Sequence, residues 1–236
     1  LKNDVTIIAA GINEGEFQDR SKLNLPGKQE EMILKLASTG KPIVVLLFGG
    51  SAITMNNWID KVNAVLDVWY PGEAGAEAMV DVLYGKANPS GKLPITFPLN
   101  EGQLPLNYNH KPTGRGDDYN DGSGQPLFPF GYGLSYTEFE YRNAVLSKRK
   151  IAVNESTAIK FTIRNTGNVD GDEVVQLYLK DELASVARPV KELKAFQRIS
   201  LKAREEKEVV FEITPAMLSL LNDRIERVVE PGTFRI

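Results

Sequence analysis

Three carboxylates stand close together in one polar loop near the start of the chain. The loop runs from Gly11 to Arg20, and its acids are Glu14, Glu16 and Asp19. It directly follows an apolar run of strand length, residues 5–10. In open parallel α/β sheets, ligands bind outside the carboxyl ends of the strands, which is where such a loop lies. A carboxyl group there has the chemistry of a general acid for cleaving a glycosidic bond.

The loop also has a purely structural interpretation. Acidic surface loops are usually only solvated, and on that interpretation Asp19 forms a local ion pair with its neighbour Arg20. A solvent-exposed pair of this kind contributes little to stability. The acids alone therefore do not choose between a catalytic loop and a solvated one.

A serine follows a second strand-sized run, in the order Gly49-Gly50-Ser51. The pattern lacks the last glycine of the G-x-S-x-G nucleophile elbow. His110, the one histidine, would have to be the base of any serine hydrolase. We instead predict a tight strand-to-helix turn in which Ser51 is the N-cap.

Composition excludes several classes of protein. The 236 residues are 42% hydrophobic and 25% charged, close to the globular average, and the net charge is −3. This balance argues against a nucleic-acid partner or a polybasic membrane surface. No cysteine and one histidine exclude a multi-histidine or cysteine metal site within this sequence. No run approaches the ~18 apolar residues of a membrane helix.

The elements that would position the loop alternate in type over residues 1–98. Strand-sized apolar runs at 5–10, 43–48 and 64–69 alternate with helical stretches after Pro26, around 52–61 and at 72–83. This order predicts a parallel α/β sheet, and the apolar strands favour helices on both of its faces.

The rest of the chain differs from residues 1–98 in composition and in the pattern of its apolar residues. Residues 99–135 are a long connector rich in Asn, Gly, Asp and Pro, which we expect to pack as an ordered loop. Residues 136–236 alternate apolar and polar side chains, for example at 159–164 and 209–213, with turns between the runs. Short strands at this spacing predict a β-sandwich of immunoglobulin or fibronectin type. The final residues, which look like a strand just beginning, suggest that this sandwich is C-terminally truncated.

Several segments, in order along nearly the whole chain, resemble glycoside hydrolase family 3. They are Glu14–Arg20, Leu23–Gln29, Gly40–Leu47, Val68–Gly75, Asn88–Pro98, Phe130–Phe139 and Asn165–Tyr178. The Asn88–Pro98 and Phe130–Phe139 blocks are the most specific of them. The resemblance implies an α/β sandwich portion followed by a fibronectin type III-like β-sandwich.

The resemblance also implies an activity. Members of this family are retaining exo-glycosidases, mostly β-glucosidases, in which a barrel supplies the nucleophilic Asp and the α/β sandwich supplies the acid/base Glu. This sequence has no Ser-Asp-Trp motif and no room for a barrel. We therefore expect the C-terminal portion of such an enzyme, partnered by an N-terminal barrel domain in the same polypeptide or on a separate chain, and acting on an oligosaccharide or other β-glycoside.

Two glutamates compete for the acid/base role. Alignment on Asp19-Arg20 selects Glu16, which we prefer, whereas counting from the end of the strand selects Glu14. In the connector, His110, Arg115 and Tyr119 are candidate substrate-binding residues on the leaving-group side. A merely structural strap between domains is the equally weighted alternative for that segment.

The remaining expectations also follow from the resemblance. They are a periplasmic or extracellular location and no required cofactor or metal. Two alternatives stay open: a β-xylosidase or other exo-glycosidase on the same scaffold, and a non-catalytic carbohydrate-binding or adhesion protein, which would have no reason to keep the Glu14–Arg20 loop.

One prediction follows directly. The purified 236-residue chain should not hydrolyse aryl β-glucosides, because its nucleophile is expected elsewhere. Release of nitrophenol from such a substrate measures this, and clear turnover by the chain alone would contradict the prediction.

Overall fold

The computed structural model describes residues 3–113 and 118–236, which form two compact units. The α/β unit comprises residues 3–87, 94–106 and 118–130, and the β-sandwich unit comprises residues 88–93, 107–113 and 131–236. The two units therefore interleave along the chain. The boundaries predicted at 98 and 135 divide the sequence by texture, whereas spatial contacts assign two short pieces of the connector region to the β-sandwich unit.

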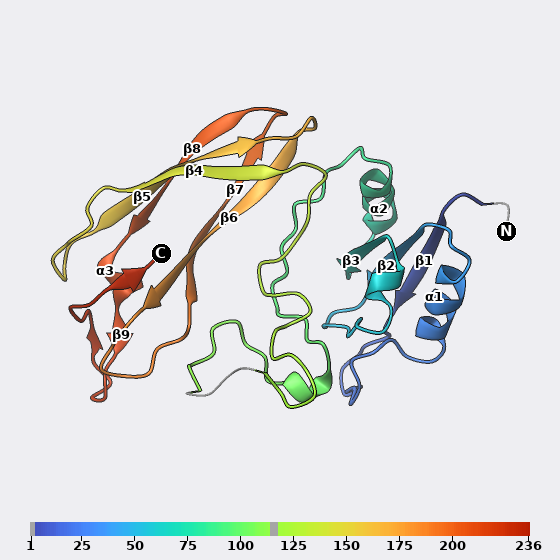
Figure 1. Ribbon diagram of the computed structural model, residues 1–236, viewed down its shortest axis with the longest axis horizontal. Coiled ribbons are helices and arrows are strands. Elements are labelled where there is room, and N and C mark those ends of the chain that lie inside the picture. The colour runs from blue at the N-terminus through green and yellow to red at the C-terminus, as the bar shows by residue number, and fades with distance from the viewer. Residues whose placement is uncertain (1–2, 114–117) are drawn as a thin grey trace. The chain divides into compact units, whose positions relative to one another are not determined.

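A three-stranded parallel sheet organises the α/β unit (Figure 1). Its strands are β1 (Thr6–Gly11), β2 (Ile43–Phe48) and β3 (Ala64–Trp69), in that spatial order. The predicted parallel sheet is confirmed. All three strands end at the same edge, so the loops that follow them gather there.

Two α-helices accompany the sheet, α1 (Gln29–Ala37) and α2 (Gly75–Leu83). The first residue of α1 ties the helix to the end of β1. Its side-chain amide accepts a hydrogen bond of 2.8 Å from the Gly11 N–H and donates one of 2.9 Å to the Gly11 carbonyl. Gln29 therefore fixes the point where the acidic loop leaves the sheet.

The helix predicted around residues 52–61 is wrong. Only one 3₁₀ turn, η1 (Ile59–Lys61), forms there, and Ser51 caps no helix. Residues 52–55 before it are buried, Trp58 is fully buried, and the Thr54 N–H donates to the Leu23 carbonyl at 3.0 Å. A backbone donor committed to a distant segment is lost to a helical ladder.

The two faces of the sheet differ in burial. Ile8, Val45 and Leu47 on one face are almost completely buried, whereas Ile7 on the opposite face is half exposed. Connections between parallel strands are right-handed as a rule, and with the order β1-β2-β3 this rule puts α1 and the 49–63 connection on the same face of the sheet. The expected cover on both faces is therefore incomplete over β1 in the described residues.

The second unit is an antiparallel β-sandwich, as predicted. One sheet has the order β4-β5-β8 and the other the order β11-β6-β7. The strands are β4 (Phe139–Leu146), β5 (Thr157–Asn165), β6 (Gly171–Asp181), β7 (Glu192–Leu201), β8 (Glu206–Ile213) and β11 (Phe234–Arg235). A short helix α3 (Pro215–Leu218) and the pair β9 (Leu220–Leu221) and β10 (Arg227–Val228) follow β8.

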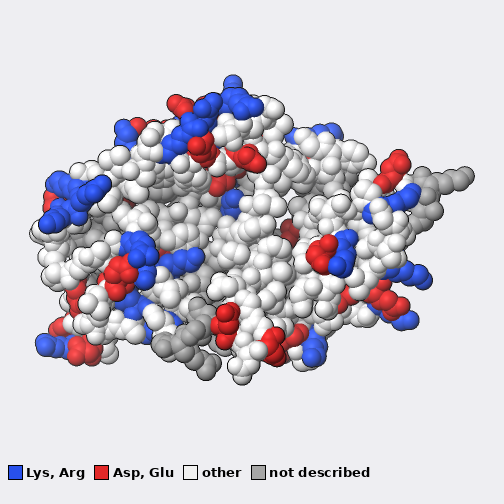
Figure 2. All heavy atoms as spheres, in the orientation of Figure 1, with Lys and Arg blue, Asp and Glu red and all other residues white. Residues whose placement is uncertain are grey.

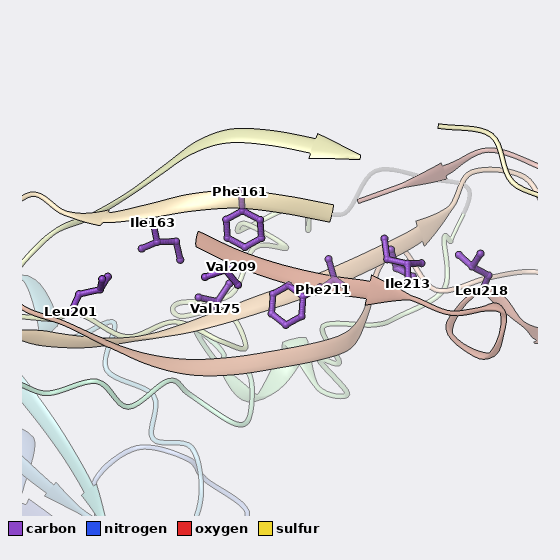
Figure 3. Close-up of a cluster of buried hydrophobic side chains, with 10 residues drawn as sticks. Phe161, Ile163, Val175, Leu201, Val209, Phe211, Ile213 and Leu218 are labelled. Carbon is purple, nitrogen blue, oxygen red and sulfur yellow. The ribbon is translucent and has the colours of Figure 1, made fainter. Parts of the chain in front are cut away.

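Alternation along the strands builds the core of the sandwich (Figure 3). Phe161 and Ile163 point inward from β5 and meet Val209 and Phe211 of β8, with Val175 of β6 facing them from the other sheet. The intervening residues point to solvent, because successive side chains of a strand lie on opposite faces. The predicted inward set is therefore the observed core.

A fully buried asparagine closes the β5–β6 turn. The Asn165 Oδ1 accepts hydrogen bonds from the Thr137 hydroxyl at 2.5 Å and from the Gly167 N–H at 3.0 Å. Its amide group donates to the carbonyls of Val169 and Leu201, at 2.8 and 3.3 Å. Four partners in three different segments, Thr137 before β4, Gly167 and Val169 in the turn and Leu201 of β7, make this side chain a structural hub of the β-sandwich unit.

The two most family-specific blocks of sequence meet within the same unit. Asn88 accepts hydrogen bonds from the Ser135 hydroxyl and the Tyr136 N–H, and donates to the Asp170 carbonyl. Lys92 donates to the Gly133 carbonyl at 2.9 Å and pairs with the nearly buried Glu173 at 3.3 Å. Residues 88–93 are therefore a polar strap across the sandwich.

Charged side chains of both signs are interspersed on the face shown in Figure 2. Within residues 3–113 and 118–236, no helix is both long and apolar enough to cross a membrane.

The Asn165 hub gives a stability prediction. Asn165→Ala should lower the free energy of unfolding of the β-sandwich unit by about 2–3 kcal/mol or more, since each buried polar group left without a partner costs ~1–3 kcal/mol. Urea denaturation followed by far-UV circular dichroism measures this loss. The matched control Asn168→Ala alters an exposed residue of the same turn and should change stability by only about 0.5 kcal/mol. Equal effects of the two variants would contradict the hub.

Candidate active site

The carboxylate of Glu14 lies where the ends of all three parallel strands meet. Its Oε2 accepts hydrogen bonds from the Gly50 N–H at 2.6 Å, after β2, and from the Tyr70 hydroxyl at 2.7 Å, after β3. Its Oε1 accepts a hydrogen bond from the Ser51 hydroxyl. Glu14 itself follows β1, so one side chain joins the three strand ends.

Arg20 completes this arrangement at the far end of the loop. Its Nη2 donates to Ser51 Oγ at 2.6 Å and lies 3.6 Å from Glu14 Oε1, where both side chains are 19% exposed. The expected local pair of Asp19 with Arg20 is therefore wrong, because the guanidinium turns inward to Ser51 and Glu14. We call Glu14, Arg20, Ser51 and Tyr70 the loop-base cluster.

Two glycines leave room for the cluster. A Cβ at Gly50 would lie 2.5 Å from Cε2 of the Tyr70 ring, and a Cβ at Gly49 would lie 2.4 Å from Cγ1 of Ile12. Both distances are far below a normal carbon contact. The Gly49-Gly50 pair thus serves close approach of the two neighbouring loops rather than a nucleophile elbow.

The electrostatics of Glu14 are those of an ionised anchor. Partial burial alone would raise the pKa of its carboxyl group, but the hydrogen bonds from Ser51, Tyr70 and Gly50, together with the charge of Arg20, outweigh burial and lower it. The hydrogen bond to Glu14 also raises the pKa of the Tyr70 hydroxyl, because that bond needs the phenolic proton. Both groups therefore hold their hydrogen-bonding states near neutral pH.

Glu16 has the opposite surroundings. It lies at the second position of a turn closed by the hydrogen bond from the Gln18 N–H to the Gly15 carbonyl, at 3.1 Å. Residues 15–19 are all exposed, and among the described residues the Glu16 side chain makes no hydrogen bond or ion pair. This carboxyl group is free to meet a ligand.

Two aromatic residues near the site have left-handed backbone conformations. Phe17, next to Glu16, has a φ of 63° and is 93% exposed, and Trp69, at the end of β3, has a φ of 51°. Such conformations are strained for bulky side chains and cluster at functional sites. At Trp69 the register between β2 and β3 also shifts, and the chain leaves the sheet so that Tyr70 reaches Glu14.

The candidate substrate-binding residues of the connector do not all lie in the unit that holds Glu14 and Glu16. Tyr119 lies in the α/β unit, where its hydroxyl donates to the Gly102 carbonyl at 3.1 Å. His110 lies in the β-sandwich unit, exposed, with its carbonyl accepting a hydrogen bond from the Val190 N–H at 2.9 Å. Arg115 lies outside the described residues. Substrate binding by these three residues stays a prediction.

The part of the chain that the structure describes holds no group of three or more His, Asp or Glu side chains arranged to bind a metal ion. The Glu14 carboxylate instead faces hydrogen-bond donors. The arrangement can therefore hold one carboxylate ionised at the sheet edge and present a second to a ligand.

Sequence reasoning missed Ser51 and Tyr70 as parts of the site. The available signal was their position, because each comes one to three residues after the end of a parallel strand. Residues at such ends meet at one edge of the sheet. Applying that rule to β2 and β3, and not only to β1, would have indicated both residues.

Comparisons with known proteins agree with this picture. Residues 1–136 match the model of the glycosyl hydrolase family 3 C-terminal domain, and residues 173–236 match that of a fibronectin type III-like domain. The chain is 41% identical to a β-xylosidase of Formosa agariphila and 38% identical to a periplasmic β-glucosidase of Salmonella typhimurium, covering 99% of this chain and 33% and 32% of those proteins.

The chain is also similar to solved structures of β-glucosidases. A β-glucosidase of Listeria innocua in complex with glucose superposes with a TM-score of 0.95 at 39% identity, over 99% of this chain and 34% of that chain. This chain spans about a third of the length of the curated relatives that it matches.

Strand β3 carries an acid, Asp67, whose pKa is raised. Burial raises the pKa of Asp67 to about 6, and the hydrogen bond from the Trp69 N–H, at 3.3 Å, offsets this only in part. Below its ordinary pKa of 3.8 the group is protonated in both the folded and the unfolded chain. As pH rises toward 6, the unfolded chain releases the proton first, so folding loses stability across that range.

Replacing this acid should remove the loss. Asp67→Asn should raise the free energy of unfolding of the α/β unit at about pH 7.5 and change it much less at about pH 4. Urea titrations followed by tryptophan fluorescence report on this unit, because both tryptophans, Trp58 and Trp69, lie in it. Asp4→Asn, at an exposed acid before β1, is the control. A gain of the same size at both pH values would contradict the burial argument.

Proposed function

Because this chain belongs to glycosyl hydrolase family 3, we propose that it supplies the general acid/base of a retaining exo-β-glycosidase whose nucleophile lies on an N-terminal barrel domain. The observation that carries the proposal is the contrast between the two glutamates of one loop. Glu14 is held ionised by four partners, whereas Glu16, two residues on, is exposed on a turn beyond the carboxyl edge of the sheet.

The mechanism has two steps. In the first, a carboxylate nucleophile attacks the anomeric carbon, the glycosidic C–O bond breaks, and Glu16 gives its proton to the departing oxygen. In the second, the Glu16 carboxylate takes a proton from water as that water attacks the anomeric carbon and releases the nucleophile. Glu16 is regenerated as an acid, and the sugar keeps its anomeric configuration.

Exposed apolar surface in the α/β unit supports the need for a further domain. Ile7 of β1 is 50% exposed, Val80 of α2 is 45% exposed, and Tyr84, just after α2, is 76% exposed. Exposed apolar surface of this kind marks an interaction surface where it is contiguous. The relatives are three times as long as this chain, which leaves ample chain for such a domain.

We assign the substrate as a terminal, non-reducing β-D-glucosyl residue, because solved β-glucosidase structures match this chain with a TM-score of 0.95. A β-xylosidase is the second candidate, carried by the 41% identity with the Formosa agariphila protein. A non-catalytic carbohydrate-binding role is disfavoured by the exposed acid on a tightly held loop. The relative named as periplasmic supports a periplasmic or extracellular location.

The acid/base assignment predicts a leaving-group dependence. In the complete enzyme, Glu16→Ala should slow cellobiose hydrolysis by about 10²–10⁴-fold, the usual contribution of general acid/base catalysis. The first step on a dinitrophenyl glucoside should slow far less, because that leaving group departs without a proton. The glycosyl-enzyme should then accumulate, and azide should restore turnover, since it attacks without needing a base.

Glu14→Ala is the comparison variant in this experiment. Azide rescue in Glu14→Ala and not in Glu16→Ala would assign the acid to Glu14. Absence of rescue in both variants would place the acid outside this loop.

A further inference from the structure

The two ends of the Glu14–Arg20 loop meet at one hydroxyl group. The Ser51 hydroxyl donates a hydrogen bond to Glu14 Oε1 and accepts one of 2.6 Å from Arg20 Nη2. The Glu14–Arg20 ion pair, at 3.6 Å, closes the same triangle. Between these residues, 15–19 are all exposed. The loop is thus fixed at its base and open at its tip.

Glu16 depends on this base for its position. Its side chain makes no hydrogen bond or ion pair within the described residues, so only the backbone of the turn places it. That turn begins at Gly15, directly after Glu14, and contains the left-handed Phe17. A strained turn keeps such a geometry when its surroundings hold it there.

We propose that the loop-base cluster is a positioning device for the acid/base, with Glu14 as a positioning residue and not the proton donor. The inference rests on the proposed role of Glu16. Proton transfer needs heavy atoms about 2.6–3.2 Å apart, and a misplacement of ~1 Å can cost ~10²-fold in rate. A carboxylate that already accepts three hydrogen bonds and faces Arg20 serves as an anchor. The lowered pKa of Glu14 agrees with this role.

Ser51 and Glu14 give the test in the complete enzyme. Ser51→Ala removes the shared hydroxyl, and Glu14→Gln keeps the size of the side chain but removes its charge. Each should lower kcat on cellobiose by about 10–100-fold, a part of the ~10²–10⁴-fold that the acid/base supplies, with KM changed by less than about threefold. Azide should rescue neither variant, because Glu16 is still present. Ser51→Thr, which keeps a hydroxyl, should retain most of the activity.

Hydrogen exchange supplies a readout of the loop itself. In Ser51→Ala and Glu14→Gln, the amides of residues 12–20 should exchange faster, while those of β2 should not change. The matched control is Ser185→Ala, because Ser185 also bonds a carboxylate, that of Glu230, but in the β-sandwich unit. It should leave both kcat and exchange at residues 12–20 unchanged.

The outcomes separate the two proposals. Faster exchange at 12–20 with unchanged kcat would overturn the positioning role and leave the role of Glu16 intact. Azide rescue of Glu14→Gln would overturn both, because Glu14 would then be the acid/base. Full activity of Glu16→Ala on cellobiose would refute the proposed function irrespective of how the cluster variants behave.

Discussion

The candidate site depends on the hydrogen bonds that the Glu14 carboxylate accepts. This carboxylate bonds to groups that follow β2 and β3, while its own residue follows β1. Because parallel strands end at one edge, a single ionised side chain can join all three loops there. Without it, the backbone donor at Gly50 and the hydroxyl groups of Ser51 and Tyr70 would lose a common acceptor, and the base of the Glu14–Arg20 loop would lose its closure.

Backbone exceptions around the site serve this convergence. The absence of side chains at Gly49 and Gly50 lets Ile12 and the Tyr70 ring come close, and the left-handed conformation at Trp69 turns the chain so that Tyr70 reaches Glu14. Such strain persists only where neighbouring contacts hold it. At Trp69 those contacts include the edge-on packing of its ring against Phe97 and the hydrogen bond of the next residue, Tyr70, to Glu14.

In the β-sandwich unit, too, single side chains join several segments, here in a structural role. Asn165 satisfies four partners from a fully buried position, and Asn88 bonds three groups from two separate segments. A primary amide carries both donors and an acceptor, so one side chain can satisfy several backbone groups that a turn leaves unpaired. In two of the sequence blocks that resemble the family, those that begin at Asn88 and Asn165, side-chain hydrogen bonds thus replace missing backbone pairing.

Local patterns in the sequence determined the class of each unit. The apolar runs at 43–48 and 64–69 and the alternation at 159–164 and 209–213 depend on period and composition, which act over a few residues, and all four became strands. The placement of the acidic loop after the first strand also followed from order alone. Tertiary structure decided what propensity could not: residues 52–55 are buried without a helix, because Thr54 donates to distant Leu23. It also turned Arg20 from adjacent Asp19 to Glu14 and brought in Ser51 and Tyr70, which lie 31 and 50 positions beyond Arg20 in sequence. Their partners are set by which strand ends converge, and that convergence exists only once the sheet has formed.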